Sequence, residues 1–93
     1  SNLLSKYRFE LSNSLERMLT EEQAVTVKDD MTFARSFLNT LVARLDKELD
    51  DKIQESEAQL NYDNPNWELK QAELLGYRRA IRKVKEIIRP IEE

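Results

Sequence analysis

The sequence contains no cysteine and no histidine among its 93 residues. The lack of cysteine excludes disulfides and thiolate ligands. The lack of histidine removes the usual ligand of zinc and non-haem iron sites, and also the commonest general base. A catalytic serine triad is excluded for the same reason, and the single glycine excludes a glycine-rich phosphate loop. We therefore predict a non-enzymatic protein that holds no cofactor and no metal.

Glycine and proline are also scarce, with one glycine and two prolines. Sheet proteins depend on these residues for their tight turns, so this scarcity favours an all-α fold. No apolar run approaches the roughly 20 residues that span a bilayer, and the N-terminus lacks the apolar core of a signal peptide. We therefore expect a soluble, unsecreted chain without membrane contact. Its length of 93 residues fits one domain with a modest core.

The first part of the chain has apolar residues at helical spacing. They recur every three or four positions, at Leu4, Tyr7, Leu11, Leu15 and Met18. This spacing predicts an amphipathic helix over about residues 3–19. Thr20 to Gln23 have the form of a capping box, but the β-branched residues that follow disfavour helix mildly. We therefore interpret residues 20–28 as a connector with room for one helical turn.

A long helix is predicted next, over residues 30–61, which contain no glycine and no proline. Asp29 or Asp30 can cap it and place negative charge at the positive end of the helix dipole. An apolar stripe follows its length, at Met31, Ala34, Leu38, Leu41, Leu45, Leu49 and Ile53. A helix of about 30 residues is roughly 45 Å long, so the molecule should be elongated.

The third predicted helix covers residues 65–89. Asn64 can cap it, Pro65 suits its first position, and Pro90 disfavours a helical residue before it. Residues 61–65, Asn-Tyr-Asp-Asn-Pro, should reverse the chain in front of this helix. The predicted fold is therefore all-α: one helical domain over residues 1–93, consisting of a long antiparallel helical hairpin plus the N-terminal amphipathic helix.

Two patterns lie within the third helix. The first is an apolar seam close to the heptad period of a coiled coil, formed by Trp67, Leu74, Tyr77, Ile81, Val84 and Ile88. We interpret the seam as a core or self-association surface. The second is a ridge of small residues at Ala72, Gly76 and Ala80. A glycine inside a helix costs about 1 kcal/mol relative to alanine, so the ridge predicts close packing of another helix backbone, with a flexible hinge as the alternative.

Charge is distributed unevenly along the chain. Residues 46–63 hold seven acidic and two basic residues, whereas residues 78–89 hold six basic residues and one acidic residue. The two stretches would lie at different ends of the hairpin, so the rod should be electrically polar. Four acidic residues could face a protein partner: Asp46, Glu48, Asp50 and Asp51. Four basic residues could contact phosphate or an acidic partner: Arg78, Arg79, Arg82 and Lys83.

Several interpretations of these charges remain open. They are either solvated helix faces, with the basic residues near a helix C-terminus where the dipole favours them, or contacts for a partner. The partner would be a second copy paired head to tail, an acidic protein or a nucleic-acid backbone. The net charge of −3 and the isoelectric point near 5.1 argue against a dedicated nucleic-acid binder.

Residues 67–81 contain the pattern W-x3-Q-A-x3-G-Y-R-x-A-I, which includes Trp67, Gln71, Gly76 and Arg78. It resembles the C-terminal helix of many small tailed-bacteriophage proteins. The resemblance implies a virion or assembly component, or a short host-takeover factor, located in the cytoplasm of a bacterial host or in the virion. It implies no particular binding residue.

Three helices, two of them long, cannot enclose a deep core, so leftover apolar surface should be covered by self-association. We expect a homo-oligomer with a structural or interaction role, which includes contact with another phage or host protein. Two alternatives are an inhibitor or adaptor that binds a host protein through the acidic residues, and a nucleic-acid-binding accessory that uses residues 78–89.

Overall fold

The computed structural model describes residues 2–59 and 66–93, and this part of the chain is mostly helical. A 3-10 turn η1 (Leu3–Ser5) precedes a short strand β1 (Tyr7–Phe9) and a one-turn helix α1 (Asn13–Glu16). Three longer helices follow, α2 (Glu21–Phe33), α3 (Arg35–Gln59) and α4 (Trp67–Ile88), and strand β2 (Pro90–Glu92) comes last. The predicted helical class is therefore confirmed, with a two-stranded sheet that was not predicted.

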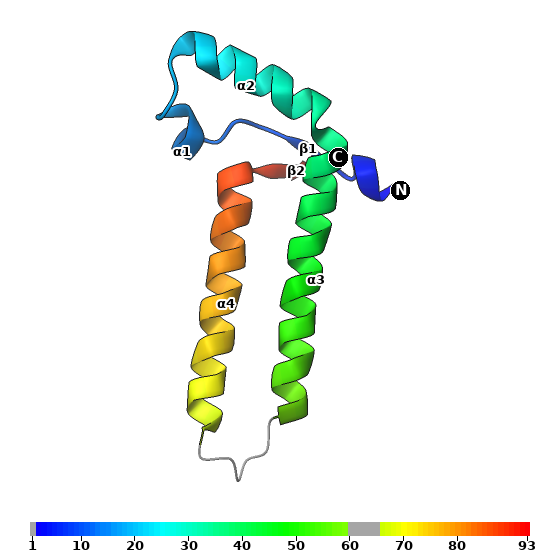
Figure 1. Cartoon of the computed structure of the whole chain (residues 1–93), viewed down its shortest axis with the longest axis vertical. Coiled ribbons are helices and arrows are strands. Elements are labelled where there is room, and N and C mark those ends of the chain that lie inside the picture. Colours follow the sequence, from blue (N-terminus) through cyan, green and yellow to red (C-terminus); the bar gives the residue numbers. More distant parts are fainter. Residues whose placement is uncertain (1, 60–65) are drawn as a thin grey trace.

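Helices α3 and α4 lie side by side and run in opposite directions (Figure 1). They share a thin core that includes Val42, 1% exposed, with Leu74 and Ile81 facing it from α4. Helix α2 crosses beyond one end of this pair, on the same side as the sheet (Figure 1). The molecule measures 57 × 31 × 16 Å with a radius of gyration of 17.2 Å, well above the roughly 12 Å of a compact domain of this length. The chain therefore presents a large surface for its core.

The prediction of one helix over residues 3–19 is wrong. Tyr7 to Phe9 instead pair antiparallel with the C-terminal residues, Tyr7 opposite Glu92 and Phe9 opposite Pro90. Aromatic residues favour strands. Tyr7, Phe9 and Leu11 occupy alternate positions, as on one face of a strand, although Tyr7 and Leu11 also fit helical spacing. Leu11 is buried, and Ser12 then caps α1 by accepting a hydrogen bond from the Leu15 N–H at 3.3 Å.

The connector predicted over residues 20–28 is also wrong, because these residues form the first half of α2. The predicted capping box is present and starts this helix. The Thr20 hydroxyl oxygen accepts from the Gln23 N–H at 3.2 Å, and the Gln23 side chain accepts from the Thr20 N–H at 3.0 Å. The hydroxyl of Thr26 donates to the Glu22 carbonyl one turn back. The capping box thus outweighs the mild cost of the β-branched residues.

The helix predicted over residues 30–61 is divided at Ala34, where φ is −88° and ψ is 11°. Helix α2 ends at Phe33, and α3 starts at Arg35 in a new direction. Asp29 and Asp30 therefore lie inside α2 and cap nothing. This corner lets α2 turn away from the α3–α4 pair while its only buried residue, Ala24, stays in contact with the rest of the molecule.

Helix α4 matches its predicted extent at the C-terminal end. It stops at Ile88, and Arg89 has φ 47° and donates its N–H to the Lys85 carbonyl at 2.8 Å. The helix thus ends before the residue that precedes Pro90, as expected because the proline ring disfavours a helical residue there, and Arg89 adopts a left-handed conformation. The predicted cap at Asn64, the first position at Pro65 and the turn at 61–65 lie outside the described residues.

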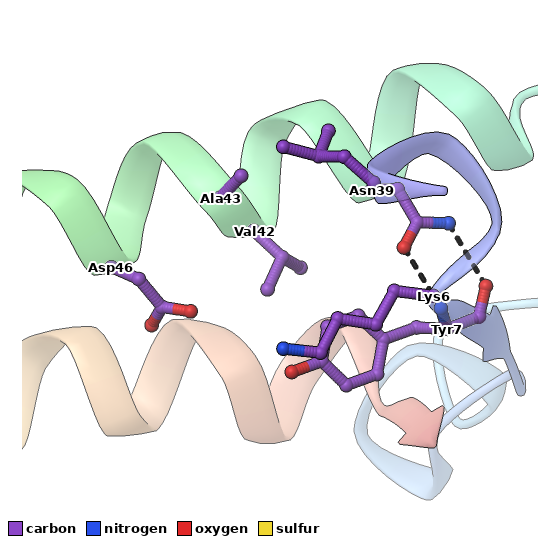
Figure 2. Close-up of a pocket in the computed structure, with 7 residues that line it drawn as sticks. Lys6, Tyr7, Asn39, Val42, Ala43 and Asp46 are labelled. Carbon is purple, nitrogen blue, oxygen red and sulfur yellow. Dashed lines mark hydrogen bonds between the residues drawn. The ribbon is translucent and has the colours of Figure 1, made fainter. Parts of the chain in front are cut away.

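Strand β1 is held on its second side by two residues of α3. Asn39, 2% exposed, accepts a hydrogen bond from the Tyr7 N–H and donates one to the Tyr7 carbonyl, both at 2.9 Å (Figure 2). One turn earlier, Arg35 donates to the carbonyls of Tyr7 and Ser5 at 2.9 Å and pairs with Glu93 at 3.1 Å. The two ends of the chain are therefore fastened to the start of α3.

Candidate interaction surface

The α3–α4 layer has two sides, and the N-terminal segment lies on one of them. A hollow of about 290 Å³ remains there between this segment and α3, lined by Leu3, Lys6, Tyr7, Asn39, Val42, Ala43 and Asp46 (Figure 2). Two of its polar side chains are already engaged: the Asn39 amide holds the Tyr7 backbone, and Asp46 pairs with Lys85, while the Lys6 ammonium lies 5.3 Å from the centre of the Tyr7 ring. The hollow therefore offers little to a polar ligand.

The other side of the layer carries a mostly apolar groove of about 220 Å³. It is lined only by residues of α3 and α4, namely Leu45, Glu48, Tyr77, Ala80, Ile81 and Val84. Successive helical residues are about 100° apart, so Leu45 points roughly 200° away from Ala43, which lines the first hollow. We call this side of the layer the groove face. Val84 is 39% exposed on it, whereas Ile81 is buried at its floor.

A hydrogen-bonded group of side chains connects the two helices at the groove. The Tyr77 hydroxyl donates to Glu48 Oε1 at 2.8 Å, and the other Glu48 oxygen pairs with Arg44 at 2.8 Å. The hydrogen bonds from Tyr77 and then Arg44 lower the pKa of Glu48, and the bond to Glu48 raises the pKa of Tyr77. The Lys52 ammonium lies 5.8 Å from the centre of the Tyr77 ring. These contacts fix the register of α4 on α3.

The predicted apolar seam is divided between core and surface. Leu74 and Ile81 are buried, Tyr77 and Ile88 are half-buried, and Trp67 and Val84 are exposed. The seam therefore serves the contact between α3 and α4 with one edge and the groove face with the other. Three members line the groove: half-buried Tyr77, buried Ile81 and exposed Val84.

The small residues Ala72, Gly76 and Ala80 are exposed, and a Cβ atom on Gly76 would meet nothing within 4 Å. The prediction that these residues pack closely against another helix is therefore wrong for the described part of this chain. The reason is the rotation of α4, which turns Leu74 and Ile81 toward α3 and leaves Ala72 and Gly76 exposed, with Ala80 at the groove.

The predicted acidic partner residues are largely engaged within the chain. Asp46 pairs with Lys85 across the two helices, Glu48 binds Tyr77 and Arg44, and Asp51 pairs with Lys47 at 3.0 Å. Only Asp50, of these four, is exposed without such a contact among residues 2–59 and 66–93. The four side chains therefore do not form one free acidic site.

The predicted basic residues are all exposed. Lys83 lies 3.9 Å from Glu86, whereas Arg78, Arg79 and Arg82 form no ion pair within the described residues. The three arginines lie on the flank of α4 away from the groove: Arg78 lies beside exposed Leu75, and Arg79 and Arg82 follow Leu75 by one and two turns. The structure thus keeps these guanidinium groups available to solvent.

Sequence reasoning missed two features. Asn39 and Arg35 fasten the chain ends, and the signal that could have found them is a polar residue within the apolar stripe of α3, one turn after an arginine. Phe33, 90% exposed, and Phe37 flank the corner at Ala34. Their exposure is the second missed feature. In a continuous helix over residues 30–61 these two aromatic residues would lie one turn apart on the same stripe.

Comparison of the chain with protein-family models, with curated proteins and with solved structures found no match. Across the described ranges, acidic side chains form no cluster able to hold a metal ion. In the same ranges, no helix combines the length and the apolar character needed to cross a membrane.

Proposed function

We propose that this chain is a non-enzymatic protein that works by self-association, as a structural or assembly component. The groove face carries the proposal: both of its walls belong to α3 and α4, its lining is mostly apolar, and Val84 is exposed on it. An exposed apolar patch of this kind marks an interaction site.

The size of the layer supports this role. Helix α4 has 22 residues, which gives a length of about 33 Å, and two packed helices are roughly 20 Å wide. One groove face therefore measures about 650 Å², so pairing two of them buries about 1,300 Å². Stable interfaces start near 1,200 Å², and the groove face is thus large enough to hold two copies together.

The test is light scattering coupled to size-exclusion chromatography, over a range of protein concentrations and at low and moderate salt. Wild-type chain should form a defined oligomer. Val84→Glu should shift the equilibrium strongly toward monomer, because it places a charge in the apolar groove. Leu75→Glu is the matched control: it changes an exposed leucine on the opposite flank of α4 and should leave the oligomer intact. Monomer at every concentration of wild-type chain would contradict the proposal.

The resemblance of residues 67–81 to small tailed-phage proteins supports a more specific context, a virion or assembly component of a phage. Self-association is the property that such a component requires. The test is to look for this chain among the proteins of purified virions. A stoichiometric number of copies would support the virion context, and absence of the chain would exclude it.

A second candidate, nucleic-acid binding, is favoured by the exposed guanidinium groups of Arg78, Arg79 and Arg82. It predicts binding to duplex DNA that weakens steeply with salt. Replacing the three arginines by alanine should abolish that binding. A flat titration of wild-type chain at low salt would eliminate this candidate.

A further inference from the structure

We propose, building on the self-association above, that two copies pair through their groove faces with their helices antiparallel. A twofold axis then crosses the middle of α4, perpendicular to the helices, and α4 of one copy lies on α4 of the other in the opposite direction. The occupant of the groove face is therefore a second copy of this chain.

The distribution of charge over the α3–α4 layer favours this arrangement. The half next to the sheet, residues 35–46 and 78–88, holds seven basic and two acidic residues. The far half, residues 47–59 and 67–77, holds three basic and seven acidic residues. Antiparallel pairing places the basic half of each copy on the acidic half of the other, whereas the reverse orientation opposes like charges.

Individual charges at the groove face fit the same axis. Glu73 lies one turn before Tyr77, and Lys83 lies one turn after Ala80, so both border the groove along α4. An axis at the middle of α4 is equally far from both, and thus brings Glu73 of one copy to Lys83 of the other.

The surface between these charges allows close approach. Gly76 and Ala80 are exposed, and the space beside Gly76 is open to 4 Å. The axis places Gly76 of one copy against Ala80 of the other. Exposed Leu69 and half-buried Ile87 lie nine residues on either side of the axis and meet in the same way.

The first test exchanges charges. Glu73→Lys and Lys83→Glu should each weaken the dimer about tenfold in Kd, because each turns two attractive contacts into repulsive ones. The double variant should bind like wild type, and an equimolar mixture of the two single variants should form a heterodimer. Equal effects of the single and double variants, or no effect from any of them, would overturn the antiparallel arrangement.

The second test uses the absence of native cysteine. Under mild oxidation, a mixture of Leu69→Cys and Ile87→Cys chains should form a disulfide-linked heterodimer. Leu69→Cys alone should not crosslink, because its two copies would lie about 27 Å apart, at 1.5 Å per residue, and a disulfide requires Cα atoms within about 7 Å.

The outcomes separate the two proposals. If the chain associates but Leu69→Cys crosslinks with itself, or the mixture does not crosslink, the antiparallel arrangement is wrong and self-association stands. If wild-type chain remains a monomer at all concentrations, both are wrong. Association together with crosslinking of the mixture alone supports both.

Discussion

Asn39 is the residue on which the N-terminal strand depends most directly. Its amide is buried and satisfies both backbone groups of Tyr7, at 2.9 Å each. We expect Asn39→Leu to lower the free energy of unfolding by roughly 2–3 kcal/mol, because it leaves the Tyr7 N–H buried without a partner. Urea unfolding measures the change. Thr40→Val, at the exposed neighbouring position, should stay within about 0.5 kcal/mol of wild type; an equal loss in both variants would refute the role of the amide.

The pair of Tyr77 and Glu48 gives the groove a pH dependence. The pKa of Glu48 is lowered from 4.5 by the Tyr77 hydroxyl and then by Arg44. The contribution of the pair to stability is therefore complete above pH 4.5 and is lost as the pH falls through the lower pKa of the folded state. The pKa of Tyr77 is raised from 10.0, so its contribution is lost as the pH rises through the higher pKa of the folded state.

We expect Tyr77→Phe to raise the pKa of Glu48 and to weaken the loss of stability as the pH falls below 4.5. Carboxyl chemical shifts followed by NMR measure the first effect, and unfolding at each pH measures the second. Tyr7→Phe, which leaves the groove untouched, serves as the control. An unchanged pKa of Glu48 in Tyr77→Phe would show that the hydroxyl does not hold the carboxylate in solution.

At the scale of elements, the helix ends and caps that depend on neighbouring residues could be predicted from the sequence. The end of α4 before Pro90 and the capping box at Thr20 are set by neighbouring residues, and both are present. Strand β1 was not predicted, because its partner is about 80 residues away and because the alternation of Tyr7, Phe9 and Leu11 is too short to outweigh the helical spacing of the surrounding apolar residues. The change of direction between α2 and α3 at Ala34 was also not predicted, because no glycine or proline lies near it.

A substitution at Gly76 measures how much the low helix propensity of glycine reduces the stability of α4. Because a Cβ atom would meet nothing within 4 Å, Gly76→Ala should raise the free energy of unfolding of the single chain by about 0.5–1 kcal/mol. Thermal unfolding at a concentration below that of association measures it, and Ala72→Gly, on the same exposed flank, should lower it by a similar amount. A loss of stability in Gly76→Ala would mean that another backbone crowds this position.

At the scale of the whole molecule, the sequence indicated which residues of α4 are apolar but not which of them face α3. Periodicity places Leu74, Ile81 and Val84 on one seam, and only the rotation of α4 against α3 separates buried Ile81 from exposed Val84. The uneven charge was evident from the sequence, and the structure places it along the layer. Arg35 and Asn39 leave one sequence signal, a polar residue within the apolar stripe one turn after an arginine, but that signal does not identify their partners, because the hydrogen bonds go to the backbone of a distant segment.

Arg35 connects both ends of the chain to the start of α3, so a substitution at Arg35 measures how much these connections contribute to stability. Its guanidinium joins the carbonyls of Ser5 and Tyr7 to the carboxylate of Glu93, so it links segments that are nearly the whole chain apart. Arg35→Met keeps the apolar stem but removes these bonds, and it should cost roughly 1–2 kcal/mol.

Hydrogen exchange locates the effect of Arg35→Met. Amides of β1 and β2 should lose protection, whereas those around Leu45 and Ile81 should keep it, because these two residues line the groove, to which the chain ends contribute no residue. Arg79→Met, which alters an exposed arginine of α4, should leave both regions unchanged. If protection falls equally throughout the chain in Arg35→Met, the sheet and the helical layer unfold as one cooperative unit.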